Sequence, residues 1–479
     1  MARSMVRHGA AVRGRRLGIM AAMSYATARR QANADLNKLQ PEDRPVHEWY
    51  RFVLSFPPHL VRQYVERLGF DGSQRVLDPF CGTGTVLVEC KKRGIPSVGV
   101  EANPMAHFAS RVKVNWRPDP AGLLEHAQEV AAAAERELAR AGLHDDPALT
   151  QGVEGAELRR LAPDAERLLL RDSISPLPLH KTLVLLDCLD RNRGERYRDH
   201  ELLALAKAVV LTSSNLHFGP EVGVGPAKRD APVIAPWLAA VGAMADDLVR
   251  VGGLQDVPAV VHHGDSRHLR DMLEPQSVDG IITSPPYPNE KDYTRTTRLE
   301  SVLLGFIRDR ADLRALKQGL LRSNTRNVYK ADDDDRWVAE HPEIQRIAAA
   351  IEARRVELGK TSGFERLYGR VTRLYFGGMA RHLADLRAVL RPGARLAYVV
   401  GDQASYLRVM IRTGHLLAEI AWALGYEPAA VELFRTRRAT ATGEDLREEV
   451  VVLRWPGAQP RVQAEGPLGR SVRAVVGSA

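Results

Sequence analysis

The sequence predicts an α/β protein whose doubly wound sheet is interrupted by an inserted helical lobe. Residues 75–78 form a short apolar run that ends in an acid and leads through a glycine-rich turn into a helical pattern over 86–92. A second short apolar run, 97–101, also ends in an acid. Strand, glycine turn, helix and strand are the opening of a doubly wound sheet. Between residues 120 and 251 the pattern changes to long helices rich in Ala, Leu and Arg.

The elements that follow continue this alternation. Pro104 suits the first turn of a helix and predicts one over 105–113. Apolar runs return at 259–263 and 278–283, and each leads into polar residues. The remaining expected elements are a helix over 375–390, a strand over 396–400, a helix over 414–424 and strands near 430–434 and 449–455.

The inserted segments differ in character. In the helical lobe we predict helices over 123–141 and 157–170. Residues 309–360 predict an irregular second insert, in which the acidic run Asp332 to Asp335 is expected to be a solvated loop. At the other end of the chain, ordered structure is expected to begin near Pro45.

Composition narrows the class of protein. The chain has 479 residues, of which 44% are hydrophobic and 27% are charged, the balance of an ordinary globular protein. These values exclude a peptide, a disulfide-stapled miniprotein and a globally disordered chain. The formal net charge of +9 favours approach to a polyanion such as nucleic acid, although many basic proteins bind none.

Cysteine usage and hydropathy indicate the compartment. Cys81, Cys90 and Cys188 are too few for a disulfide framework or a four-thiolate zinc site, and their odd number suits a reducing cytoplasm. No apolar run approaches the roughly 18 residues that cross a bilayer, so we expect a cytoplasmic protein without membrane association or a bound metal. The Arg-rich residues 1–30 are interpreted as a basic arm or an overlong start, in preference to a transit peptide.

The first candidate site is the turn from Asp78 to Thr85, which contains Gly82 and Gly84. Two glycines let the backbone approach a ligand closely, although an ordinary structural turn explains them equally well. Glu101 ends the next strand, where a carboxylate can accept both hydroxyls of a ribose. The glycine turn and Glu101 together favour an adenosine-containing cofactor. The glycine spacing fits neither a dinucleotide site nor an ATP-binding loop.

The second candidate site is Ser284-Pro285-Pro286-Tyr287, which follows the run at 278–283. Two prolines remove two backbone donors and stiffen the chain, so the serine hydroxyl and the neighbouring carbonyls are held as acceptors. Acceptors beside an aromatic ring suit the exocyclic amino group of a planar base. The structural alternative is a rigid proline turn with a packed tyrosine.

Together these two motifs resemble those of the S-adenosylmethionine-dependent DNA amino-methyltransferases, the N4-cytosine and N6-adenine methylase family. Residues 56–60, Phe-Pro-Pro-His-Leu, are similar to the segment that precedes the cofactor loop in that family. The resemblance covers about residues 46–113 and 259–455 and leaves both inserts unmatched. It implies a Rossmann-like doubly wound methyltransferase sheet and the cofactor S-adenosyl-L-methionine.

The resemblance also implies roles for individual residues. Phe80, Gly82 and Gly84 would line the methionine end of the cofactor, Glu101 would bind its ribose and Asp265 its adenine. Ser284 and the carbonyl of Pro285 would hold the target amino group, and Tyr287 would stack on an extruded base. The expected cofactor-binding residues are Asp78, Phe80, Gly82, Gly84, Thr85, Glu101 and Asp265, and the expected catalytic residues are Ser284, Pro285, Pro286 and Tyr287.

The expected substrate is cytosine N4 in DNA, since serine before Pro-Pro-Tyr is more usual for cytosine methylases and Asp or Asn for adenine N6. Adenine N6 is therefore the first alternative, and an RNA base amino-methyltransferase is the second. A nonenzymatic nucleic-acid-binding protein that kept a methylase fold is a third, but it predicts damage to one of the motifs, and Gly82, Gly84 and Tyr287 are all present. The expected partners are double-stranded DNA and a companion restriction nuclease.

The resemblance and the element order divide the chain. Residues 1–44 are expected to be a basic, disordered arm and 458–479 a loose tail. The methyltransferase domain is expected to comprise a cofactor-binding half (45–119), a target-base half (252–308) and a C-terminal part (371–457), separated by a helical insert that is a candidate for target recognition (120–251) and by a second insert (309–370).

Overall fold

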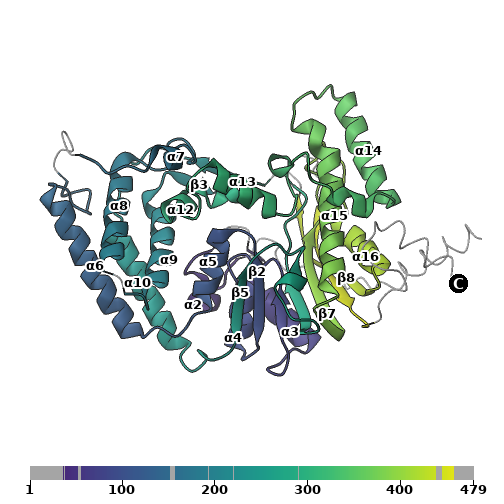
Figure 1. The fold of residues 1–479 in the computed structure, drawn as a ribbon, viewed down its shortest axis with the longest axis horizontal. Coiled ribbons are helices and arrows are strands. Elements are labelled where there is room, and N and C mark those ends of the chain that lie inside the picture. Colours follow the sequence, from purple (N-terminus) through teal and green to yellow (C-terminus); the bar gives the residue numbers. More distant parts are fainter. Residues whose placement is uncertain are drawn as a thin grey trace, which may run out of the picture.

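The computed structural model describes residues 36, 38–51, 55–150, 157–192, 194–218, 221–289, 291–438 and 445–457 (Figure 1). Its centre is a seven-stranded sheet in the order β5-β2-β1-β6-β7-β9-β8. The first five strands in this order are parallel, and β9 pairs antiparallel with both of its neighbours. The predicted doubly wound α/β sheet is therefore confirmed. The strands are β1 Val76–Asp78, β2 Ser97–Glu101, β5 Ala259–His263, β6 Val278–Thr283, β7 Leu390–Gly401, β8 Glu427–Arg438 and β9 Asp445–Arg454.

The order of the strands reverses direction at β1. The chain first adds β2 and β5 on one side of β1 and later adds β6 and β7 on the other side. Leu77 of β1 lies beside Val98 on one side and Ile281 on the other. In open α/β sheets, ligands bind outside the carboxyl ends of the strands at such a switch point. Both candidate motifs directly follow the two strands that meet here.

Successive residues of a strand point to opposite faces of the sheet, so apolar side chains on both faces have to be covered. Helices cover them on each face. Ile282 belongs to the apolar core that includes α3 (Pro58–Leu68), α4 (Thr85–Lys92) and α5 (Pro104–Lys113). Its neighbour Ile281 belongs to the core on the other face, with α15 (Tyr368–Leu386) and α16 (Thr413–Ala423). The result is three layers, with the sheet between two layers of helices.

The helical lobe extends the first of these cores, since Val130, Leu185 and Trp237 belong to the same apolar cluster as α4 and α5. The predicted helix over 157–170 is wrong. Pro163 lacks a backbone donor and fits only the first turn of a helix, and the helix that begins there is one turn long. The elements of the lobe are α6 Pro120–Arg140, α7 Pro163–Glu166, α8 Pro176–Arg191, α9 Arg198–Ala208, the π-helix η2 Val209–Ser213, the hairpin strands β3 Leu216–Phe218 and β4 Val222–Val224, and α10 Ile234–Arg250.

The second insert contradicts the prediction of an irregular segment. The Asp309 side chain accepts a hydrogen bond from the amide of Asp312 and starts α13, and Pro342 occupies the first turn of α14 after the His341 cap. The acidic run is also not a solvated loop, because Asp334 is buried. The elements from the target motif to α15 are α11 Tyr293–Thr296, α12 Arg298–Leu303, α13 Arg310–Gly319, η4 Thr325–Asn327, η5 Asp334–Val338, α14 Pro342–Glu357 and η6 Glu365–Leu367.

Several predicted boundaries shift. The helix expected over 375–390 is α15, which ends at Leu386 because β7 already begins at Leu390. The arm expected over 1–44 is also shorter. The 3-10 helix η1 (Pro41–Asp43) lies within it and leads into α2 (Arg44–His47), which is kinked at Pro45 and Val46, and the buried Asp43 binds Arg62. Residues 1–35 and the expected tail, 458–479, lie outside the described residues. Within the described ranges, no helix combines the length and apolar character that a membrane crossing needs.

Candidate active site

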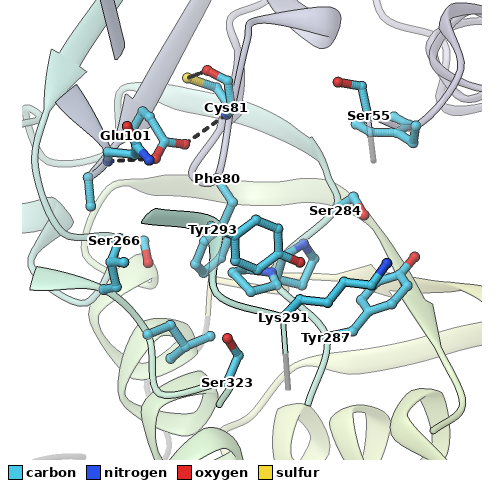
Figure 2. Close-up of a pocket in the computed structure, with 18 of the residues that line it drawn as sticks. Ser55, Phe80, Cys81, Glu101, Ser266, Ser284, Tyr287, Lys291, Tyr293 and Ser323 are labelled. Atoms are coloured by element: carbon cyan, nitrogen blue, oxygen red, sulfur yellow. Dashed lines mark hydrogen bonds between the residues drawn. The ribbon is translucent and has the colours of Figure 1, made fainter. Parts of the chain in front are cut away.

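A cavity of about 510 Å³ opens at the carboxyl edge of the sheet, and both candidate motifs line it (Figure 2). Phe80 and Gly82 come from the turn after β1 and Thr85 from the start of α4. Glu101 comes from the end of β2 and Asp265 from the loop after β5. The wall formed by the second motif consists of Ser284, Pro285, Pro286 and Tyr287. Segments about 200 residues apart in the chain therefore face the same space.

Two of the predicted cofactor residues, Asp78 and Gly84, do not line the cavity. The Asp78 carboxylate accepts hydrogen bonds from the Thr283 hydroxyl at 2.6 Å and from the amide of Phe80 at 3.1 Å. Burial raises the pKa of Asp78 to about 7, against the opposing effect of these hydrogen bonds. Asp78 thus joins the ends of β1 and β6 and orients Phe80, while Gly84 turns the chain tightly against Ser110.

Glu101 fastens the glycine turn to the tip of β2. Its carboxylate accepts hydrogen bonds from the amide of Gly82 at 2.8 Å and from the amide of Asn103 at 2.7 Å, and burial raises its pKa. Gly82 has a positive φ of 52°, and a Cβ there would meet no atom within 4 Å. The turn is consequently rigid and leaves open space above the backbone, as a site for close ligand approach requires.

Asp265 lines the cavity while its carboxylate is held by Arg267. The Arg267 side chain donates from Nε at 3.0 Å and from Nη2 at 2.6 Å, and the Arg267 amide donates at 2.9 Å. Burial opposes ionisation of Asp265, but the guanidinium outweighs it and holds the pKa of this carboxyl below its usual range. Sequence reasoning missed Arg267, since nothing in its sequence neighbourhood separates it from a surface arginine.

Phe80 is fixed from behind by a buried histidine. The His382 ring meets the Phe80 ring edge to face at 4.9 Å between centroids. One His382 nitrogen lies 2.8 Å from the carbonyl of Ser266 and the other 2.8 Å from the Tyr398 hydroxyl. Burial lowers the pKa of His382 to about 4, so the imidazole is neutral at physiological pH. It acts as a neutral packing partner for the cavity wall.

The target motif presents acceptors beside an aromatic ring. The Ser284 hydroxyl donates to the carbonyl of Val399 at 3.2 Å, which leaves its oxygen lone pairs as acceptors. Burial, together with the nearby Glu448 carboxylate, raises the pKa of Tyr287 above its usual range, so its hydroxyl stays protonated. Pro285 and Pro286 offer carbonyls but no amide donors.

Residues outside the predicted set complete the cavity. Figure 2 shows Lys291 and Tyr293, from the segment after the target motif, among the side chains that line it. Burial raises the pKa of Tyr293 to about 12. The helical lobe contributes Glu221, and Arg435 of β8 forms an ion pair with Glu448 of β9. The second insert contributes Gly319, Leu320, Leu321, Ser323 and Asn327.

The sheet order defines a Rossmann-like doubly wound fold, and the cavity shared by both motifs lies at its switch point. No family model matches the chain. It is 22% identical to the Type II methyltransferase M.BsoBI of Geobacillus stearothermophilus over 84% of this chain and 82% of that protein. It is 24% identical to the Type II methyltransferase M.AvaI of Nostoc sp. over 87% of each. The homologues are Type II methyltransferases, which confirms the resemblance that the two motifs indicate.

Among solved structures, the chain is similar to the rRNA methyltransferase aviRa from Streptomyces viridochromogenes. The sequence identity is 11% and the TM-score is 0.28, with 91% of this chain and 98% of that chain covered. The fold assignment therefore rests on the strand order and on the Type II homologues.

Proposed function

We propose that this protein transfers a methyl group from S-adenosyl-L-methionine to an exocyclic amino group of a base in DNA, with cytosine N4 as the target. The observation that carries the proposal is that Gly82 and Tyr287 line the same cavity. The Type II methyltransferase homologues support it, since they align with this chain over most of its length.

The residues around the glycine turn fit the proposed cofactor. Gly82 leaves room for a ligand against the backbone, and Phe80 offers an apolar surface beside it. The Glu101 carboxylate already accepts two amide hydrogens, and its remaining lone pairs suit ribose hydroxyls. Asp265 offers an acceptor for the adenine amino group. When bound, S-adenosyl-L-methionine supplies an electrophilic methyl group.

The target motif fits an amino group that must become a better nucleophile. An exocyclic amine is a poor nucleophile because its lone pair is delocalised into the ring of the base. The Ser284 oxygen and the carbonyl of Pro285 would each accept one of its hydrogens and so favour a pyramidal nitrogen. The Tyr287 ring would stack on the extruded base. Catalysis then consists of positioning and electrostatic stabilisation, with no covalent enzyme intermediate.

Cytosine N4 is preferred over adenine N6 because Ser284 stands where adenine methylases more often have Asp or Asn. Expression in a host free of DNA methylation, followed by mass spectrometry of nucleosides from DNA and tRNA, tests this choice. We expect N4-methylcytosine in DNA. N6-methyladenine in its place would contradict the choice of base, a methylated tRNA base would contradict the choice of nucleic acid, and no modification at all would contradict the enzymatic assignment.

Variants of the target motif separate catalysis from cofactor binding. Ser284→Ala and Tyr287→Ala should each reduce methyl transfer by about 100-fold or more, because each removes a group that contacts the amino group or the base. Affinity for S-adenosyl-L-homocysteine should change little. Ser277→Ala is a matched control, since Ser277 precedes the same strand at its opposite end and donates to the carbonyl of Glu274. Unchanged turnover in both target variants would refute the assigned roles.

A further inference from the structure

The acidic run of the second insert docks onto the methyltransferase domain through one buried carboxylate. Asp334 is only 4% exposed and forms ion pairs with Arg267 and Arg381. Its backbone lies directly against α15 at Gly377, where a Cβ would come within 1.9 Å of the Asp334 carbonyl oxygen. Glycine is therefore required at this contact, and the position of Asp334 is closely defined.

Arg267 connects this carboxylate to the cavity wall. Its Nη1 donates to Asp334 at 2.5 Å, while its Nε and Nη2 donate to Asp265 at 3.0 and 2.6 Å. Arg267 is 7% exposed and does not line the cavity, whereas Asp265 does. The guanidinium is planar and presents its donors in a fixed fork, so a carboxylate that holds one arm also sets the direction of the other.

The contacts with Arg267 leave Asp265 with few hydrogen-bond acceptor sites for a ligand. A carboxylate has about four acceptor sites. Arg267 donates to Asp265 from its amide, from Nε and from Nη2. The arginine therefore determines which lone pairs of the Asp265 carboxylate remain open to a ligand and in which direction they point. The adenine amino group would have to approach from that direction. A small rotation of the guanidinium would therefore misalign Asp265 with the ligand.

We propose that Arg267 is a positioning residue for the adenine end of the cofactor, and that Asp334 of the second insert acts through it. The series Asp334, Arg267 and Asp265 makes the docking of the second insert part of the cofactor site. The same insert supplies Leu321 and Ser323 to the cavity wall, so its docking also shapes the space beside the target motif. This inference rests on the proposed function.

Calorimetric titration with two ligands tests the inference. One ligand is S-adenosyl-L-homocysteine, and the other is S-inosyl-L-homocysteine, which carries a carbonyl in place of the adenine amino group and so lacks the exocyclic donor proposed to bind Asp265. Asp334→Asn and Arg267→Met should each lower the affinity for S-adenosyl-L-homocysteine by about tenfold. This is the loss expected for a misaligned hydrogen bond to a charged group. The second ligand should bind the variants and the wild type within twofold. Arg267→Lys should restore part of the loss, since it keeps the charge but not the fork.

Asp333→Asn is the matched control, because Asp333 is exposed and pairs only with Arg336 among the ion pairs of this loop. It should leave both affinities unchanged. Asp334→Asn with wild-type affinity for both ligands would overturn the inference. An equal loss for both ligands would also overturn it, because it would indicate general disruption of the cavity. A wild-type protein that fails to bind S-adenosyl-L-homocysteine would contradict the proposed function itself.

Discussion

Single residues in and around this cavity differ in what they do. Asp78 begins the glycine motif yet does not line the cavity, and it joins two strand ends through Thr283. Glu101 lines the cavity and at the same time holds the glycine turn through the amide of Gly82. A sequence motif therefore marks the site as a unit without separating the residues that touch a ligand from those that support them.

The raised pKa of Asp78 predicts a specific pH dependence of stability. With a pKa of about 7 in the folded protein against an ordinary value of 3.8, this carboxyl keeps a proton that the unfolded chain loses. Its contribution to the free energy of unfolding therefore falls as the pH rises from about 4 to about 7 and is constant above that. Asp78→Asn keeps the acceptor oxygen for Thr283 without the titration, so it should gain stability relative to the wild type across this range.

Urea denaturation of both proteins at several pH values from 5 to 8 measures this difference. The stability of Asp78→Asn relative to wild type should increase with pH and level off above about 7. A difference that is independent of pH would show that Asp78 is ionised throughout.

At the scale of elements, the parallel strands could be predicted and the second insert could not. The runs at 97–101 and 278–283 match β2 and β6, because an interior strand must be apolar along its length, and the run at 259–263 matches the edge strand β5. The second insert docks through ion pairs such as Asp334 with Arg267, and its residues look like a solvated surface in the sequence. The contacts that order it join positions 67 residues apart, which no local pattern reveals.

Both motifs could be found from the sequence because each combines unusual residue types over a short span. The residues that complete the cavity, such as Lys291, Ser323 and Arg435, carry no comparable local signal. Lys291 comes from the segment after the target motif, whereas Ser323 reaches the site through the packing of the second insert and Arg435 through the antiparallel strand β8.

The glycine turn predicts different outcomes for its two glycines. Both have positive φ, but a Cβ at Gly84 would lie 3.0 Å from the Ser110 side chain, while a Cβ at Gly82 would meet open space. Gly84→Ala should therefore lower the free energy of unfolding by at least about 1 kcal/mol more than Gly82→Ala, which carries mainly the backbone cost of about 1–2 kcal/mol. Gly82→Ala should instead weaken S-adenosyl-L-homocysteine binding.

Chemical denaturation and calorimetric titration separate these effects. Gly142→Ala is the control for the backbone cost alone, since Gly142 has a φ of 70° and open space around it, outside the cavity. Equal stability losses at positions 82 and 84, together with an unchanged ligand affinity for Gly82→Ala, would contradict this account of the turn.

At the scale of the whole molecule, the helical lobe and the second insert flank the sheet edge. Figure 1 shows α6, α8 and α10 of the helical lobe at the left, α14 of the second insert at the right, and α13 of the second insert between them. Both inserts reach the cavity, through Glu221 of the first and Ser323 of the second. Under the proposed function, nucleic acid approaches the cavity between them, and the net charge of +9 favours this approach.

This arrangement predicts a salt-dependent affinity for double-stranded DNA in which Lys291 contributes. Each phosphate contact adds about 0.9 to the slope of log affinity against log salt concentration. Lys291→Gln should weaken binding and reduce that slope by about this amount, without changing the affinity for S-adenosyl-L-homocysteine. Lys360→Gln is the control, since Lys360 pairs with Glu365 and does not line the cavity. Fluorescence anisotropy over a range of salt concentrations measures both slopes, and equal slopes for the two variants would contradict a phosphate contact by Lys291.

The central claim is that one cavity holds the methyl donor beside the target motif. A crystal structure of the protein with S-adenosyl-L-homocysteine tests it most directly. We predict that the ribose lies at Glu101, the adenine at Asp265, and the sulfur on the side of the cavity that faces Ser284 and Tyr287. A ligand bound elsewhere on the protein, or one whose sulfur is separated from the target motif by protein side chains, would contradict the account.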